Sequence, residues 1–155
     1  MAVDPLRRQR SQSDYLGFDY GDKKIGIAVG NRETGLAAPL ETVAAVKFKT
    51  NWARITVLIE QWQPEGLVVG ISRQHNGRDN PVTPKIERFS RQLEGRYQLP
   101  VHLIDETLTT YESKQLLFDE LNLSASKLWA VQDQLAAQLI LQTFLNHSKR
   151  EQITQ

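Results

Sequence analysis

Three short runs of apolar and β-branched residues predict strands in the first third of the chain. The runs Tyr15–Tyr20 (YLGFDY) and Lys24–Val29 (KIGIAV) flank a turn of glycine, aspartate and lysine, which is the pattern of a β-hairpin. A third run, Leu40–Val46, is predicted to form the next strand. The chain therefore opens with three strands that can pair in order.

After residue 50 the apolar residues recur with the period of a helix. Short continuous apolar runs interrupt this pattern. Trp52, Ile55 and Leu58 show the helical spacing, and Pro64 and Gly66 end this helix. A short run that is apolar throughout is typical of a strand covered on both faces. The elements predicted here are helices over residues 50–62, 84–97, 111–121 and 125–146 and strands over residues 67–69 and 101–104.

This order of elements predicts an α/β fold with a mixed five-stranded sheet and helices on both faces, because parallel β-α-β units need covering helices on each side. A chain of 155 residues has the size of one domain. Residues 15–147 are predicted to form that domain. Residues 1–14 are predicted to be a flexible polar tail, and residues 148–155 a polar C-terminal tail.

The composition excludes several kinds of site. The chain has no cysteine, so it cannot form a disulfide scaffold, a cysteine-ligated zinc or iron–sulfur site, or a cysteine nucleophile. No run of about 18 apolar residues predicts a membrane span. Residues 1–10 also lack the apolar core of a signal peptide. We therefore expect a cytoplasmic protein with no membrane association.

Acidic residues stand at three places where burial is predicted. Asp19 ends the first strand, Asp105 and Glu106 follow the strand over 101–104, and Asp133 lies in an apolar stripe of the last helix. A buried ionised carboxylate costs several kcal/mol unless it is paired or binds a metal. Taken singly, each residue is explained by a cap or an ion pair, such as Asp133 with a lysine.

Taken together, these carboxylates favour a metal centre. Ligands gather beyond the carboxyl ends of the strands in α/β sheets, and a following helix can bring Asp133 to that edge. Converging carboxylates need a cation, and oxygen ligands select Mg²⁺ or Mn²⁺, two of which can support a phosphodiester displacement. Neighbours on a strand point to opposite faces, so the choice between Asp105 and Glu106 stays open. The candidate catalytic and metal-binding residues are Asp19, Asp105, Glu106 and Asp133.

The net charge of +1 conceals two segments of opposite sign. Residues 70–100 contain six basic and three acidic residues, whereas residues 101–120 contain one basic and five acidic residues. An acidic metal centre flanked by basic segments suits a phosphodiester substrate. The candidate phosphate contacts, for which a polar turn and a solvated loop are the alternatives, are Lys23, Lys24, Arg73 and Arg78.

Four motifs follow one another along the chain. They are Phe18–Gly21 with Lys24–Ala28, Leu67–Gly70 with Asn76-Gly77, Asp105–Thr110, and Asp133–Ala137 with Leu139–Gln142. In this order and spacing, over residues 16–145, they resemble the YqgF/RuvX family of Holliday junction resolvase-like proteins, also described as nucleases that finish the 5′ end of pre-16S ribosomal RNA.

The resemblance implies a ribonuclease H-like fold and a nuclease that depends on Mg²⁺ or Mn²⁺. It implies that Asp19, Asp133 and either Glu106 or Asp105 are the ligands. It also implies a nucleic-acid partner, either pre-rRNA or branched DNA, and a protein that is a monomer or a homodimer.

The chain departs from the usual family pattern at four places. Ser72 replaces a proline, Asn76 an aspartate and Thr107 an arginine. Leu128-Trp129 replaces a basic pair, with Lys127 one position earlier as a candidate substrate contact. These changes spare the four candidate metal-binding carboxylates and alter the expected substrate contacts. Those at Ser72, Thr107 and Leu128-Trp129 motivate an alternative, a non-catalytic module of the same fold that binds nucleic acid or a protein.

A second enzyme class shares one of these motifs. The sequence Asp19-x-Gly21 also resembles the first phosphate loop of sugar kinases and actin-like ATPases. Those proteins close two such domains around ATP, and 155 residues supply one. The length therefore favours the nuclease.

Overall fold

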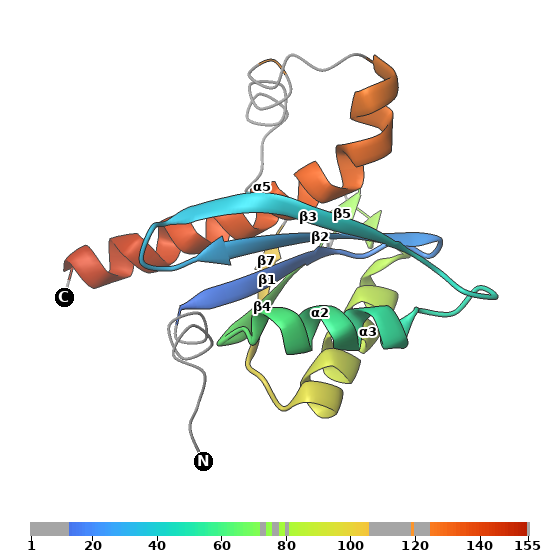
Figure 1. Cartoon of the computed structure of the whole chain (residues 1–155), viewed down its shortest axis with the longest axis horizontal. Helices are drawn as coiled ribbons and strands as arrows, with labels where there is room; N and C mark the ends of the chain where they lie inside the picture. The colour runs from blue at the N-terminus through green and yellow to red at the C-terminus, as the bar shows by residue number, and fades with distance from the viewer. Residues whose placement is uncertain are drawn as a thin grey trace.

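The computed structural model describes residues 13–71, 74–75, 78–79, 81–105, 119 and 125–154 (Figure 1). Its strands are β1 (Asp14–Asp19), β2 (Lys24–Asn31), β3 (Leu36–Ala44), β4 (Gly66–Ile71), β5 (Gln74–His75), β6 (Arg78–Asp79) and β7 (Val101–Asp105). The described helices are α2 (Trp52–Trp62), α3 (Thr83–Tyr97) and α5 (Ala125–Thr154). The helix predicted over residues 111–121 falls outside the described residues, apart from Asp119, which is helical.

Five of the strands form one mixed sheet in the order β3-β2-β1-β4-β7. The strands β1, β2 and β3 pair antiparallel, as the hairpin pattern predicts, whereas β1, β4 and β7 run parallel. A parallel step needs a long crossover connection, and α3 supplies it between β4 and β7. The prediction of a mixed five-stranded sheet is therefore confirmed.

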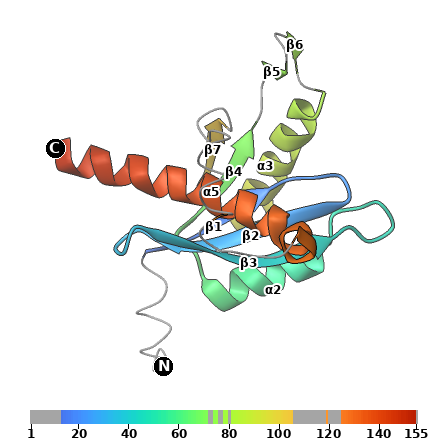
Figure 2. The ribbon, with the colours of Figure 1, turned by 90° about the horizontal axis from the view of Figure 1, so that it is seen from above.

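Helices cover both faces of the sheet, as Figures 1 and 2 show. The helices α2 and α3 pack on one face, where Phe18 and Phe89 belong to the larger apolar cluster. The helix α5 packs on the other face, where Val68 and Leu141 belong to a second cluster. Because successive strand residues alternate between the two faces, Asp19 lies on the α5 face, opposite to Phe18.

Glycines on the α5 face let this helix lie very close to the sheet. A Cβ atom at Gly17 would lie 2.8 Å from the Cβ atom of Leu141. A Cβ atom at Gly26 would overlap the backbone carbonyl group of Asp133. Neither position has room for a side chain, so the backbone of α5 lies directly on β1 and β2.

Two glutamines fix the position of α5 along the sheet. Gln138 Nε2 donates a hydrogen bond to the backbone oxygen of Ala37 at 3.0 Å. Gln142 Nε2 donates to the backbone oxygen of Gly35 at 2.7 Å, and Gln142 Oε1 accepts from the backbone N–H of Ala37 at 3.0 Å. These bonds attach the helix to β3 and hold Asp133, on the same helix, in one register.

Two predicted ends are wrong. β1 begins at Asp14, inside the predicted tail, because Asp14 pairs with Asn31 across the hairpin and its Oδ1 accepts a hydrogen bond from Asn31 Nδ2 at 2.9 Å. α5 continues to Thr154 through the segment predicted to be a polar tail. Residues 147–154 contain no glycine or proline, and their lysine, arginine, glutamate and glutamine favour a helix. None of the helices in the described part of the chain is long and apolar enough to cross a membrane.

The third strand was predicted over residues 40–46, and its bounds also differ. β3 begins at Leu36, which pairs with Asn31 across a turn in which Gly35 has a φ of 72°. β3 ends at Ala44, because Val46 pairs with Lys49 in a separate tight turn. Glycine at the first turn makes the left-handed conformation possible without strain.

An ion pair connects α2 to β3. Arg54 donates two hydrogen bonds to Glu41, from Nε to Oε2 and from Nη2 to Oε1, each at 2.6 Å. These bonds hold the pKa of Glu41 below its ordinary value of 4.5, because they stabilise the charged carboxylate.

We expect the Glu41→Gln variant to unfold at a lower urea concentration than the wild type at pH 7. Because the pKa of Glu41 is lower in the folded than in the unfolded state, its stabilising effect is complete well above pH 4.5 and is lost as the pH falls through the lowered value. The difference between the two proteins should therefore shrink on acidification. Urea titrations from pH 7 to pH 3 measure this, with Glu60→Gln on α2 as the control; a constant difference contradicts the assignment.

Candidate active site

The carboxyl ends of β1, β4 and β7 meet at one edge of the sheet. The register aligns Phe18 of β1 with Val69 of β4, and Val69 with Leu103 of β7. Asp19 and Asp105, the last residues of β1 and β7, therefore both lie at this edge, which we call the carboxyl edge. The strand β4 lies between them, so two strand spacings of about 4.8 Å each separate the two backbones.

Asp19 and Asp105 belong to opposite faces of the sheet. Ile104 packs against the cluster under α5, whereas Val101 packs against the cluster under α2 and α3. Alternation along β7 therefore assigns Asp105 to the α2 and α3 face. Glu106, the neighbouring candidate, lies outside the described residues. Asp105 therefore does not share a face with Asp19.

The helix α5 brings Asp133 close to Asp19. The backbone of Asp133 lies against Gly26, where no Cβ atom would fit. Gly26 is in turn the cross-strand partner of Asp19 in the β1–β2 ladder. Because α5 covers the face on which Asp19 lies, the two carboxylates belong to the same face and the same edge.

Lys24 forms an ion pair with Asp133. Its Nζ atom lies 2.9 Å from Asp133 Oδ2, and the lysine side chain is 41% exposed while that of the aspartate is 21% exposed. The pairing of Asp133 with a lysine, one of the two explanations drawn from the sequence, is therefore present. Asp133 Oδ2 is buried, and the ammonium group of Lys24 is in contact with it. The lysine balances the charge of the carboxylate, whose oxygens have further lone pairs for a ligand.

The donor set at the carboxyl edge suits a hard divalent cation. Asp19 and Asp133 offer carboxylate oxygens on one face, and Asp133 Oδ2 is buried there beside Lys24. Within the described residues, no three histidine, aspartate or glutamate side chains converge closely enough to hold a metal ion.

The other predicted substrate contacts are placed only in part. Lys23 is exposed in the turn between β1 and β2, beside the carboxyl edge. Arg78 lies in β6, which forms a ribbon with β5 beyond the end of β4 (Figure 2), and Lys127 lies in α5. Arg73 and the side chains of Arg78 and Lys127 fall outside what the structure describes. Of the five predicted substrate contacts, Lys24 is the one whose side chain the structure places at a candidate carboxylate, that of Asp133.

Sequence reasoning missed the role of Gly26. The available signal was an isolated glycine inside a predicted strand, which is typical of a close approach by another backbone. It also missed a basic pocket beside Tyr20 on the α2 and α3 face. The signal there was the spacing of Lys85, Arg88 and Arg96 along one side of a predicted helix.

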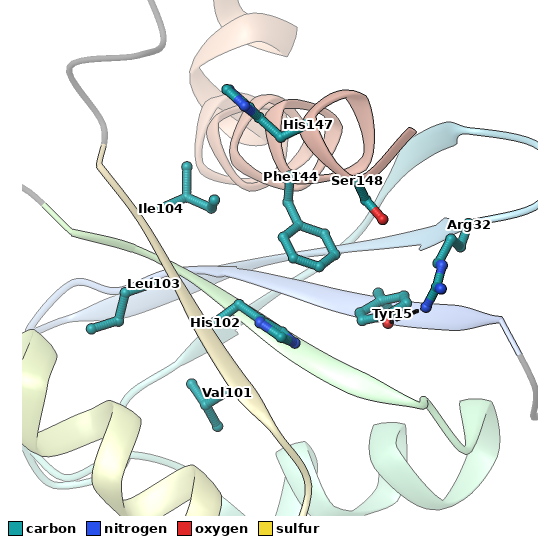
Figure 3. Close-up of a pocket in the computed structure, with 9 residues that line it drawn as sticks. All are labelled: Tyr15, Arg32, Val101, His102, Leu103, Ile104, Phe144, His147 and Ser148. Carbon is teal, nitrogen blue, oxygen red and sulfur yellow. Dashed lines mark hydrogen bonds between the residues drawn. The ribbon is translucent and has the colours of Figure 1, made fainter. Parts of the chain in front are cut away.

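Another pocket lies away from the carboxylates (Figure 3). It has a volume of about 710 Å³ at the amino end of β1, between β7 and the last turns of α5. The rings of Tyr15, His102 and Phe144 line it, and Arg32 donates a hydrogen bond to the Tyr15 hydroxyl at 3.4 Å. Burial lowers the pKa of His102, although the charge of Glu65 opposes this. Because Tyr15 and Asp19 lie at opposite ends of β1, this pocket is separate from the carboxyl edge.

Two solved structures resemble this chain in fold. RuvC of T. thermophilus, solved in complex with a Holliday junction substrate, matches with a TM-score of 0.53 and 18% identity, over 83% of this chain and 92% of that chain. The Holliday junction resolvase of fowlpox virus matches with a TM-score of 0.54 and 14% identity, over 86% of this chain and 98% of that chain. These likenesses confirm the ribonuclease H-like fold.

The sequence comparisons identify the family. A protein of Methylococcus capsulatus named "Putative pre-16S rRNA nuclease" is 51% identical over 135 residues, which cover 87% of this chain and 89% of that protein. A protein of the same name from Methylobacillus flagellatus is 44% identical over 136 residues, covering 88% of this chain and 92% of that protein. The family model described as "RuvX: Holliday junction resolvase" matches residues 13–147. The chain therefore belongs to the RuvX family, as its four ordered motifs predicted.

Proposed function

We propose that this chain is a metal-dependent nuclease that matures the 5′ end of pre-16S ribosomal RNA in the cytoplasm. Membership in a family of nucleases makes it a hydrolase acting on phosphodiester bonds. The observation that carries the proposal is the contact of α5 with β2, which sets Asp133 beside Asp19 at the carboxyl edge. The names of the sequence relatives support an RNA substrate.

We assign the metal ligands to Asp19, Asp133 and Glu106. The shared face of Asp19 and Asp133 supports the first two. Alternation in β7 supports the third, because Asp105 belongs to the opposite face and the next residue of an extended strand would return to the α5 face. Bound Mg²⁺ or Mn²⁺ would supply Lewis-acid stabilisation of phosphate charge and a more acidic attacking water.

The basic residues of the chain would position the substrate backbone. Lys24, at Asp133, can donate a charge-assisted hydrogen bond to a phosphate oxygen at the carboxyl edge. Lys23, Arg73, Arg78 and Lys127 are proposed to bind phosphates to either side of it. Contacts of this kind fix the path of a strand without reading its bases, so the site itself favours no particular sequence.

Cleavage of branched DNA is the second candidate function. The description of the family model as a Holliday junction resolvase favours it. A resolvase must cut two strands symmetrically and so needs a homodimer, whereas 5′ maturation can be performed by a monomer. The oligomeric state of the active species therefore separates the two candidates.

A substrate panel tests the proposal. We expect the protein to cut an RNA that joins the 5′ leader to the mature 16S sequence when Mg²⁺ or Mn²⁺ is present. Removal of the metal with EDTA should abolish the cleavage, and added Mn²⁺ should restore it, because the carboxylates alone cannot neutralise the charge of the reacting phosphate. Faster cleavage of a four-way DNA junction supports the second candidate. Binding without cleavage of either substrate contradicts both candidates and supports the non-catalytic module.

A further inference from the structure

We propose that a basic pocket on the α2 and α3 face binds a single-stranded segment of the nucleic-acid substrate. The pocket has a volume of about 580 Å³ and adjoins the carboxyl edge. The proposal rests on the proposed function, because it names the form of substrate that this nuclease holds. The residues that carry the argument line the pocket and are Tyr20, Phe48, Lys49, Lys85, Arg88 and Arg96.

Phe48 presents an aromatic ring to solvent at the mouth of the pocket. It is 97% exposed, at the tip of the turn in which Val46 pairs with Lys49. Phe48 has a φ of 64° and its neighbour Lys47 a φ of 52°, in the left-handed region that bulky residues rarely adopt. A turn of this kind favours asparagine and glycine. The backbone at Phe48 is thus strained, and its phenyl ring is exposed between two lysines. An exposed ring in this position can stack on a base.

The pocket carries an excess of positive charge. Lys49, Lys85, Arg88 and Arg96 line it together with one carboxylate, Asp22. Lys85 Nζ lies 3.0 Å from Asp22 Oδ2, but both side chains are more than half exposed, so this pair is weak. Four cations against one anion create a site for phosphate groups.

Trp52 orients one of the cations. The guanidinium carbon of Arg96 lies 4.2 Å from the centroid of the Trp52 ring. The same ring stacks on Phe89, with centroids 5.6 Å apart and planes inclined by 25°. Trp52 is therefore a packing residue that holds Arg96 in place, and Phe48 is the ring that remains open to a base.

The pocket meets the candidate active site at the end of β1, from the opposite face of the sheet. Tyr20 lines the pocket and directly follows Asp19 in the chain. The Tyr20 ring packs on Phe89 of α3, with centroids 5.0 Å apart, which fixes it at the boundary between the two sites. A strand that passes Asp19 would therefore reach the basic residues of α3 by crossing the carboxyl edge at Tyr20.

The combination of groups favours single strands over duplexes. Stacking on Phe48 requires an unpaired base with an accessible face, whereas the bases of a duplex are already stacked. The flanking lysines and arginines bind phosphates irrespective of the sugar, so both single-stranded RNA and single-stranded DNA fit. We therefore expect the pocket to hold the unpaired segment next to the cut.

A binding assay without divalent metal tests this inference apart from cleavage. Fluorescence anisotropy in EDTA would compare single strands of RNA and DNA of about 12 nucleotides with a duplex of equal length. We expect Phe48→Ala and Arg88→Gln each to weaken single-strand binding by about 10-fold, with Phe48→Tyr restoring wild-type affinity. Arg91→Gln removes an exposed charge from the same helix outside the pocket, and Leu36→Ala removes an exposed apolar side chain at the other end of the sheet. Both controls should bind as the wild type does.

The outcomes separate this inference from the proposed function. The inference would be overturned if both Phe48→Ala and Arg88→Gln bound single strands as tightly as the wild type does. It would also be overturned if the protein bound the duplex as tightly as the single strand. Neither result would bear on the proposed function, which the cleavage assays test separately. A strand with an abasic site gives an internal check, because Phe48→Ala should not weaken its binding further. Tighter binding of RNA or of DNA supports the pocket in either case and identifies the sugar of the substrate. Thermal melting confirms that the exposed substitutions leave the fold intact.

Discussion

The Asp133→Asn variant is expected to lose cleavage activity by at least about 100-fold while it still folds and binds substrate. The substitution keeps the size of the side chain and removes the charge that faces Lys24 and the proposed metal. Asp19→Asn should have an effect of the same order, because both carboxylates belong to one face of the carboxyl edge. Initial rates of RNA cleavage at several Mn²⁺ concentrations measure the loss, and the metal concentration for half-maximal rate should rise.

Two further variants sharpen this prediction. Glu106→Gln should lose activity as severely as Asp133→Asn, whereas Asp105→Asn should lose much less, because alternation assigns Asp105 to the opposite face. Glu60→Gln, an exposed carboxylate on α2, is the control for the loss of one negative charge. Wild-type cleavage by both Asp19→Asn and Asp133→Asn would falsify the metal-site assignment. The reverse order of Asp105 and Glu106 would refute the assignment of faces at the end of β7.

The Gly26→Ala variant is expected to be both less stable and nearly inactive. The added methyl group would overlap the backbone carbonyl of Asp133, and β2 cannot move away because it is hydrogen-bonded to β1 and β3. The helix α5 must therefore shift, which by analogy with overpacked cores lowers the free energy of unfolding by about 1–3 kcal/mol. A displacement of Asp133 by about 1 Å is enough to lower the cleavage rate by about 100-fold.

Gly95→Ala is the matched control for this experiment. Nothing lies within 4 Å of a Cβ atom at Gly95, which is exposed in α3. Alanine there should stabilise the protein by about 0.5 kcal/mol, because it restricts the unfolded chain and favours the helix. Urea unfolding and RNA cleavage are compared for both variants. A Gly26→Ala protein as stable and active as the wild type would show that α5 does not need its close contact with β2.

Much of the fold could be predicted from local patterns. The hairpin of β1 and β2, the helices α2 and α3, and the strands β4 and β7 follow from period and composition, because each pattern spans only a few neighbouring residues. β4 is buried throughout, as predicted, whereas β7 lies at the edge of the sheet and is only partly buried. The predicted ends of β3 and α5 were wrong, and the reasons for this are also local. A turn at Gly35 starts β3 early, and nothing in residues 147–154 stops α5.

The sequence by itself determined which residues are candidates for a metal site. A carboxylate that follows an apolar strand is recognisable wherever the strand lies, and the order of the strands brings Asp19 and Asp105 to one edge. Only the tertiary structure decided which of them share a face. The contact of Asp133 with Gly26 joins segments far apart in the chain, and the register of α5 on the sheet depends on packing at Gly17 and Gly26. Close packing between distant segments leaves no periodic trace in either one, so only the folded chain shows that Asp133 lies beside Asp19.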